Sequence, residues 1–136
     1  MSRRHVLAGA ILDSSGTRIL LARRARPVEL EGLWELPGGK VEAGESDEEA
    51  LRRELAEELG IDVGVESELA EQVTLSDQLV LIARWARVIA GEPAAREHQA
   101  VRWVDAEELS TLCSEGSLVP ADTVWVPELL ARLRRP

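Results

Sequence analysis

Three glutamates in one predicted helix are the residues of this chain whose type and spacing most directly suggest chemistry. Glu54, Glu57 and Glu58 stand at positions i, i+3 and i+4, so a helix brings their carboxylates onto one face. Like charges at this spacing destabilise a helix by roughly 0.2–0.5 kcal/mol per pair. A hard divalent cation, which prefers oxygen ligands, removes that repulsion. The pattern therefore suggests a metal site, and the alternative is a solvated acidic face, because the chain holds 25 acidic residues.

The helix itself is predicted from its two ends and its apolar stripe. Ser46 is a favoured N-cap residue, and Glu49 three positions later completes a capping box. Leucines recur every four residues from Leu51 to Leu59, which gives one apolar face. Gly60 then suits the end of the helix. Ahead of it, a stretch punctuated by glycines is expected to be a loop in which backbone approaches a ligand closely.

Other elements are expected to surround this helix. The strands are predicted at residues 5–12, 18–24, 34–36, 63–73, 79–90 and 100–104. The segment Asp13–Gly16 reads as a hairpin turn between the first two strands. A short helix is expected to begin at Asp105, and a last helix is expected from Asp122 through about Leu133. Strands interspersed with substantial helices predict an α/β sandwich with a mixed sheet.

The stretch from Gly39 to Ile61 resembles the Nudix box, G-x5-E-x7-R-E-U-x-E-E-x-G-U, in which U is a bulky aliphatic residue. All nine defined positions are filled, by Gly39, Glu45, Arg53, Glu54, Leu55, Glu57, Glu58, Gly60 and Ile61. The resemblance implies a hydrolase that depends on Mg²⁺, with Mn²⁺ as a substitute, and that acts on a nucleoside diphosphate linked to another group. It also implies the Nudix fold, an α+β fold in which an α/β/α sandwich holds a central mixed β-sheet.

The resemblance continues outside the box, in the order seen in MutT-like nucleoside triphosphate pyrophosphohydrolases. The matching segments are residues 33–40, 97–99, 103–104 and 119–122. This branch implies conversion of a nucleoside triphosphate and water to a nucleoside monophosphate and pyrophosphate, which would clean the nucleotide pool. The bacterial CTP pyrophosphohydrolase type, acting on (d)CTP and modified pyrimidine nucleotides, is the expected match. An oxidised-dGTP (8-oxo-dGTP) diphosphatase is the alternative, because the two types share most motifs.

Two further alternatives remain open within the same resemblance. An ADP-ribose or dinucleotide pyrophosphatase usually carries extra motifs beyond the box, and none is seen here. A nucleotide-sensing domain without catalysis is expected to lose a box carboxylate, and the three in this chain are all present.

The resemblance assigns the metal and catalytic roles to a small set of residues. The expected metal ligands are the Gly38 carbonyl and the carboxylates of Glu54, Glu57, Glu58 and Glu97, and these four glutamates are also the expected catalytic residues. Either Glu54 or Glu97 would take the proton from water, and the sequence leaves that choice open. Glu45 is expected to orient the loop, and Arg53 to position a box carboxylate.

The residues expected to bind substrate are Arg24, Arg23, Trp34, Lys40 and Asp122. Strand alternation points Arg23 and Arg24 to opposite faces, and the MutT-like branch places a phosphate-contacting arginine at Arg24. Asp122 is either the cap of the last helix or the reader of the nucleobase. As a reader, an ionised carboxylate only accepts hydrogen bonds and so favours the amino group of cytosine. Trp34 is expected either to stack on the base or to join the core.

Composition sets the remaining expectations. The 136 residues, of which 45% are hydrophobic, fit a single Nudix domain over residues 1–136. A net charge of −9 argues against nucleic acid as a partner, so the expected partner is the nucleotide substrate. Cys113 is alone, which leaves no disulfide within the chain. No signal peptide or membrane-spanning run is seen, so we expect a cytoplasmic protein without a membrane partner, either a monomer or a homodimer.

Overall fold

The computed structural model describes residues 3–135, and a seven-stranded mixed sheet is its centre. The strands are β1 (Arg4–Leu12), β2 (Ile19–Arg23), β3 (Trp34–Glu35), β4 (Gly38–Lys40), β5 (Asp62–Thr74), β6 (Leu79–Ala90) and β7 (Ala100–Val104). The helices are α1 (Asp47–Leu59), α2 (Ala106–Ser114) and α3 (Val126–Leu133), with a short 3₁₀ helix, η1 (Pro120–Trp125), before α3.

The sheet follows the order β3-β2-β1-β6-β5, while β4 pairs with β1 and β7 pairs with β2. The β1–β6 pair is parallel and runs from Arg4 opposite Leu79 to Leu12 opposite Arg87. The other strand pairs are antiparallel. The predicted mixed sheet is therefore confirmed, and β1 is the strand against which both β6 and β4 are aligned.

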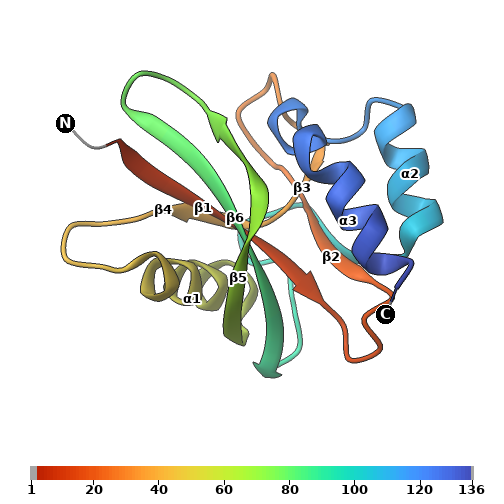
Figure 1. The fold of residues 1–136 in the computed structure, drawn as a ribbon, viewed down its shortest axis with the longest axis horizontal. Coiled ribbons are helices and arrows are strands. Elements are labelled where there is room, and N and C mark those ends of the chain that lie inside the picture. The colour runs from red at the N-terminus through yellow and green to blue at the C-terminus, as the bar shows by residue number, and fades with distance from the viewer. Residues whose placement is uncertain (1–2, 136) are drawn as a thin grey trace.

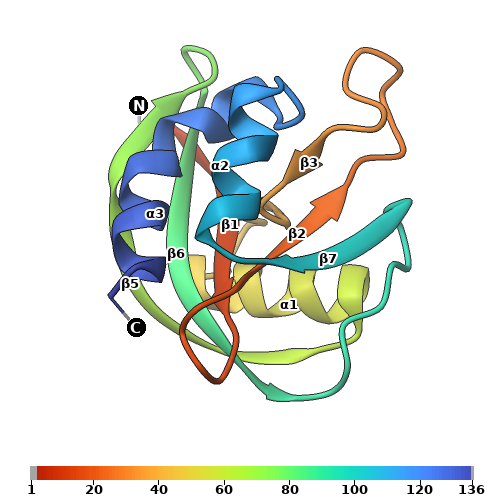
Figure 2. The same ribbon diagram turned by 90° about the vertical axis from the view of Figure 1, so that its right-hand side faces the viewer.

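Helix α1 covers one face of the sheet, and α2 and α3 cover the other (Figures 1 and 2). The two faces correspond to two apolar clusters, because alternate residues of a strand point to opposite sides. On β1, Leu7 and Ile11 belong to the cluster beneath α1. Ala10 and Leu12 belong to the cluster shared with α2 and α3. This arrangement is the expected α/β/α sandwich.

The ends of α1 follow from the residues that predicted them. The Ser46 hydroxyl accepts a hydrogen bond from the Glu49 N–H at 3.1 Å, and the Ser46 N–H donates to the Glu49 carboxylate at 2.8 Å. Gly60 ends the helix with a φ of 72°, a left-handed conformation that glycine adopts without steric cost. The Asp13–Gly16 turn is also confirmed, since the Gly16 N–H donates to the Asp13 carbonyl at 3.0 Å.

Two local expectations are wrong. The pair Gly38-Gly39 is not part of a loop, because it forms β4, in which Gly38 lies opposite Ala8 and Gly39 opposite Leu7. The last α-helix does not start at Asp122 but at Val126, after the 3₁₀ helix, and neither helix start has a side-chain cap. The Asp122 carboxylate is used elsewhere, as described below.

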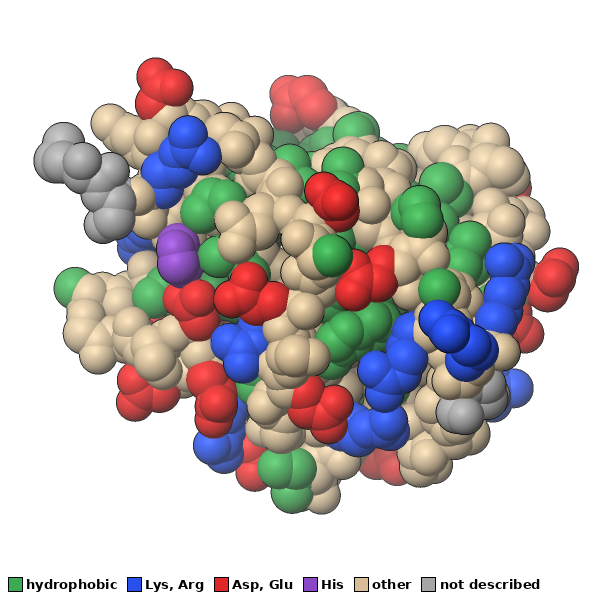
Figure 3. Space-filling model, viewed as in Figure 1, with side chains coloured by type: hydrophobic (Ala, Val, Ile, Leu, Met, Phe, Trp, Pro, Cys, Tyr) green, Lys and Arg blue, Asp and Glu red, His purple; other side chains and the backbone are tan. Residues whose placement is uncertain are grey.

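Surface charge is mixed on the face shown in Figure 3, where acidic side chains are spread widely and basic side chains form a group on the right with others scattered on the left. No broad basic surface covers this face, in keeping with the net charge of −9. Among residues 3–135, no helix combines the length and hydropathy needed to cross a bilayer.

Candidate active site

Two adjoining pockets lie where β2, β3, β4 and α1 meet. The polar pocket, about 200 Å³, is lined by Arg24, Ala25, Arg26, Glu35, Gly38, Glu54, Glu58, Glu97 and His98. The apolar pocket, about 500 Å³, is lined mainly by aliphatic side chains, and its lining also includes Asp122. The two pockets share Arg24, Glu35 and Gly38, so they form one continuous site with a charged half and an apolar half.

Four carboxylates face only two guanidinium groups in the polar pocket. Glu58 is the most buried of the four, with 5% of its surface exposed. Burial raises the pKa of Glu58 to about 9, and the neighbouring carboxylates of Glu54, Glu35 and Glu97 act in the same direction. The pocket therefore concentrates more negative charge than its own cations neutralise.

Two buried side-chain nitrogen or oxygen atoms in residues 3–135 have no hydrogen-bond partner, and both belong to residues that line the polar pocket. They are Glu58 Oε2 and His98 Nδ1. Buried polar atoms are nearly always satisfied in folded proteins, so an orphaned carboxylate oxygen in a pocket indicates a position for a ligand.

Arg53 forms hydrogen bonds to two carboxylates, those of Glu45 and Glu54, next to the polar pocket. Its Nε and one terminal nitrogen donate to the two oxygens of Glu45 at 2.6 and 3.0 Å. The other terminal nitrogen donates to Glu54 at 2.9 Å. The Arg53 hydrogen bond lowers the pKa of Glu45 to about 2. Arg53 thus contacts a box carboxylate, Glu54, and Glu45 accepts from the Glu42 N–H in the loop at 3.0 Å, so the roles expected for them stay predictions.

The two glycines of β4 make room for different neighbours. A Cβ at Gly38 would lie 1.9 Å from the Leu7 carbonyl oxygen, so only glycine permits the pairing of β4 with β1. A Cβ at Gly39 would lie 2.4 Å from the carboxyl carbon of Glu54. Because Gly39 has no side chain, the Glu54 carboxylate can pack directly against the backbone of β4.

Asp122 is a buried carboxyl group in the lining of the apolar pocket. Its Oδ2 accepts a hydrogen bond from the Leu36 N–H at 2.7 Å, and 7% of its surface is exposed. Burial raises the pKa of Asp122 to about 7, against the Leu36 hydrogen bond, which lowers it. The side chain holds η1 to β3 and does not cap the last helix.

The remaining expected site residues are less central. Glu57 lies outside both pocket linings; its carboxylate is half-exposed and 3.4 Å from Arg53. Lys40 is exposed at the rim of the apolar pocket. Arg23 is exposed, and Trp34 packs against the core shared with α2 and α3, so neither side chain lines either pocket. The alternation of β2 explains why Arg24 enters the site and Arg23 does not.

Sequence reasoning missed several residues of the site, among them Glu35 and His98, whose side chains contact each other. Glu35 accepts a hydrogen bond from Arg24 at 2.9 Å through Oε1. His98 lies 3.0 Å from the other Glu35 oxygen, Oε2. The adjacency of His98 to Glu97 was the one local signal, whereas the approach of Glu35 depends on the pairing of β3 with β2, which no short motif records.

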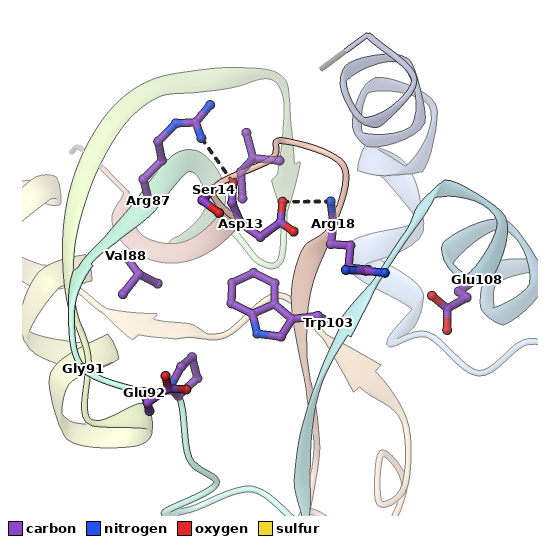
Figure 4. A pocket seen from close by; sticks show the side chains of 11 residues that line it. Asp13, Ser14, Arg18, Arg87, Val88, Gly91, Glu92, Trp103 and Glu108 are labelled. Carbon is purple, nitrogen blue, oxygen red and sulfur yellow. Dashed lines mark hydrogen bonds between the residues drawn. The ribbon is translucent and has the colours of Figure 1, made fainter.

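A larger cavity, about 780 Å³, lies apart from this site, between the β1–β2 turn, the end of β6 and Trp103 (Figure 4). Its polar groups contact one another: Asp13 accepts from the Arg18 N–H at 3.2 Å, and Arg87 donates to the Asp13 carbonyl at 3.3 Å. Neither of the two unpartnered buried atoms found in residues 3–135 lines it. Volume alone therefore does not locate the chemistry of this protein.

Comparison with known proteins gives this site its family. The model of the NUDIX domain matches residues 3–129. The chain belongs to the Nudix family. This Nudix chain is 45% identical over 131 residues to a putative 8-oxo-dGTP diphosphatase of Mycobacterium tuberculosis, covering 94% of this chain and 89% of the relative. It is 38% identical over 133 residues to the CTP pyrophosphohydrolase of Escherichia coli, covering 96% and 95%.

Solved structures agree with the family. A MutT structure, from work on Aliivibrio salmonicida and Vibrio cholerae, matches with a TM-score of 0.78 at 32% identity, covering 96% of this chain and 98% of that one. The expected Nudix fold is confirmed, and the protein is a Nudix hydrolase.

Nudix hydrolases generally use divalent metal ions such as Mg²⁺, and the polar pocket fits such an ion. Its excess of carboxylates, the orphaned Glu58 oxygen and the oxygen donors of the expected ligands all suit a hard cation. In the described part of the chain, no three His, Cys, Asp or Glu side chains already form a metal-binding group. Metal binding would therefore require the glutamate side chains to rotate toward one another.

Proposed function

We propose that this Nudix hydrolase is a Mg²⁺-dependent nucleoside triphosphate pyrophosphohydrolase, which converts a nucleoside triphosphate and water to a nucleoside monophosphate and pyrophosphate. The observation that carries the proposal is the continuity of the two pockets through Arg24, Glu35 and Gly38. The charged half suits a metal-bound triphosphate, and the apolar half suits a nucleoside. We further propose (d)CTP and 5-substituted cytosine nucleotides as the leading substrates.

The residues of the polar pocket have separate roles in the proposed reaction. Mg²⁺ would be held by the carboxylates of Glu54, Glu58 and Glu97 and by the Gly38 carbonyl, with Glu57 at the edge of the site. When bound, the ion would neutralise charge on the triphosphate and lower the pKa of a bound water. Glu54 or Glu97 takes the proton of the water that attacks the β-phosphorus. Because the pKa of Glu58 is about 9 without metal, Mg²⁺ binding near neutral pH releases a proton from it.

Arg24 is proposed to contact a phosphate oxygen. Arg24→Ala is expected to lower kcat/KM for triphosphates about 10- to 100-fold, because a charge-assisted hydrogen bond is lost. Arg23→Ala is the matched control, since Arg23 lies on the same strand end but outside both pockets. Steady-state kinetics of both variants decide the matter. An equal loss in both, or no loss in Arg24→Ala, would move the phosphate contact elsewhere.

Asp122 is proposed to read the nucleobase. One carboxylate oxygen is occupied by the Leu36 N–H, which leaves the other for the base. When ionised it accepts from the cytosine amino group and repels the carbonyl oxygens of thymine. The Trp34 side chain lies outside the pocket, so aliphatic residues such as Leu81 are proposed to pack against the base instead.

The base preference should reverse in Asp122→Asn. The amide oxygen can still accept from the Leu36 N–H, and its NH₂ group would then donate to the base and favour a carbonyl. We expect the ratio of kcat/KM for dCTP over dTTP to fall at least about 10-fold, with metal dependence retained. Asp105→Asn, at the N-cap of α2, is the control and should leave the ratio unchanged. A ratio unaffected by Asp122→Asn would remove the base-reading role.

A second candidate substrate is 8-oxo-dGTP. The relative with 45% identity is named for that activity, and guanine also offers donors to a carboxylate on its Watson–Crick edge. A panel with Mg²⁺ separates the candidates by kcat/KM for dCTP, 5-methyl-dCTP, 8-oxo-dGTP, dGTP, dTTP and ADP-ribose. The proposal expects dCTP to exceed dTTP clearly. A panel led by 8-oxo-dGTP would favour the second candidate, and turnover of ADP-ribose alone would overturn the proposed function.

A further inference from the structure

The segment between β6 and β7 is fastened to α1 and β2. The Ala94 and Arg96 N–H groups donate to the carbonyls of Leu59 and Glu58 at 3.0 and 3.2 Å, at the end of α1. The Gln99 N–H donates to the Arg23 carbonyl at 2.9 Å, at the end of β2. Glu97 and His98 lie between these attachments. Their position relative to the polar pocket is therefore fixed by backbone hydrogen bonds.

His98 is buried within that pocket between two carboxylates. Its Nε2 lies 3.0 Å from Glu35 Oε2 and 3.8 Å from Glu58 Oε1. The exposed fractions of the side chains are 8% for His98, 13% for Glu35 and 6% for Glu58. Because a carboxylate oxygen only accepts, the 3.0 Å contact makes Nε2 the protonated nitrogen that donates to Glu35.

Glu35 then carries the connection onward to Arg24. Its second oxygen accepts from Arg24 at 2.9 Å, so both of its oxygens are held, one by each partner. Glu35 is also close enough to Glu58 for its charge to oppose ionisation of the Glu58 carboxyl group. Without the N–H of His98, the Glu35 oxygen that contacts it would be left unpaired next to Glu58, and Glu35 would no longer fix Arg24.

We propose that His98 is a positioning residue: its Nε2–H holds Glu35 so that Glu35 orients Arg24 against the carboxylates of α1. This inference rests on the proposed function for the reaction that it supports, but the hydrogen bond itself is independent of substrate. His98 does not touch the substrate in this arrangement. It acts through Glu35, which stands between the phosphate-contacting arginine and the metal-binding glutamates.

Two substitutions at His98 separate positioning from mere filling of space. His98→Leu keeps the bulk and removes the donor, and we expect kcat/KM for the best triphosphate to fall about 10-fold or more. In His98→Gln the side-chain amide can donate to Glu35 from a similar position, and most of the activity should return. Thermal unfolding of both variants checks that the fold is intact. Equal activity in the two variants, whether high or low, would overturn the proposal.

The other histidine gives a matched control. His5 contacts the Asp47 carboxylate at 2.9 Å, but it lies outside both pockets of the site. His5→Leu is expected to leave kcat/KM unchanged. A loss equal to that of His98→Leu would mean that any histidine–carboxylate contact matters, and would overturn the specific role.

A double substitution tests whether His98 acts through Glu35. Glu35→Gln alone should lower kcat/KM, and adding His98→Leu to it should cause no further loss, because the two residues share one function. If the loss of kcat/KM in the double variant equals the product of the two single-variant losses, the proposal is overturned.

If the wild-type protein hydrolyses no nucleoside triphosphate, the proposed function fails, and imidazole ¹⁵N NMR then decides the inference. An Nε2-protonated His98 supports the hydrogen bond, and an Nδ1-protonated one overturns it.

Discussion

Glu58→Gln is expected to lower the Mg²⁺-dependent kcat/KM roughly 10³-fold while making the metal-free protein more stable. The loss of activity follows from removal of a charged metal ligand at the most buried position of the polar pocket. The gain in stability at pH 8 is expected because the folded wild type keeps Glu58 protonated at a pH at which the unfolded chain has released that proton, whereas Gln has no proton to release. A variant that abolishes function but stabilises the fold is the signature of a site built for a ligand.

The pH dependence of stability gives this prediction a second readout. The pKa of Glu58 is about 9 in the folded chain and near the ordinary 4.5 when unfolded. The folded state therefore keeps a proton that the unfolded state releases, so wild-type stability in EDTA should fall as pH rises from about 4.5 to about 9. Glu58→Gln should lack this contribution to the slope. Urea unfolding at several pH values measures it.

Magnesium should stabilise the wild type more than it stabilises Glu58→Gln. The wild type is expected to gain stability when Mg²⁺ replaces EDTA, because the ion binds only the folded site, and Glu58→Gln should gain less. Glu48→Gln is the control, an exposed glutamate of the same helix outside both pockets. A Glu58→Gln variant that kept most of its Mg²⁺-dependent rate, or that was less stable than wild type in EDTA at pH 8, would contradict the assignment.

Alanine substitution at the two adjacent glycines of β4 should affect different properties: stability at Gly38 and catalytic activity at Gly39. Gly38→Ala is expected to cost about 3 kcal/mol or more, because its Cβ would lie 1.9 Å from the Leu7 carbonyl oxygen and push β4 from β1. Gly39→Ala should cost less than about 1 kcal/mol, because the obstructing group is the end of the Glu54 side chain, which can rotate away. Its kcat/KM should nevertheless fall about 100-fold, since Glu54 leaves its position.

Gly64→Ala is the control for this pair, because its Cβ would make only ordinary contact with the Ile89 side chain, at 3.5 Å. Chemical denaturation and kinetics on all three variants give the comparison. If Gly39→Ala lost stability as severely as Gly38→Ala, or kept full activity, the close contact between β4 and Glu54 would not have the role assigned to it.

The sequence predicts α1 well because the signals that define it are local. The capping box at Ser46, the leucine stripe and Gly60 all lie within the helix or next to it, and each is found in the structure. The strands were also largely anticipated, since runs of apolar residues mark them. The charged half of the site follows in part, because Glu54 and Glu58 share the helix and Arg24 lies at a strand end.

The rest of the site depends on contacts between distant parts of the chain. Asp122 is a residue type that is favoured at helix N-caps, but its hydrogen-bond partner is the Leu36 N–H, 86 residues away in the sequence. The contact between Glu35 and His98 spans 63 residues and needs both β3 and the segment before β7 in place. Glu57 shows the limit of a spacing rule, because helical periodicity does not say how far each carboxylate turns into a pocket.

A ³¹P NMR spectrum of the products formed from dCTP by the wild-type protein in Mg²⁺ distinguishes release of pyrophosphate from release of orthophosphate. We expect dCMP and pyrophosphate in equal amounts, no reaction in EDTA, and turnover by Glu58→Gln in Mg²⁺ that is roughly 10³-fold slower. The same experiment with 8-oxo-dGTP should give the corresponding monophosphate and pyrophosphate if that nucleotide is also a substrate. Release of orthophosphate with a nucleoside diphosphate, or turnover that persists in EDTA, would contradict the proposed function.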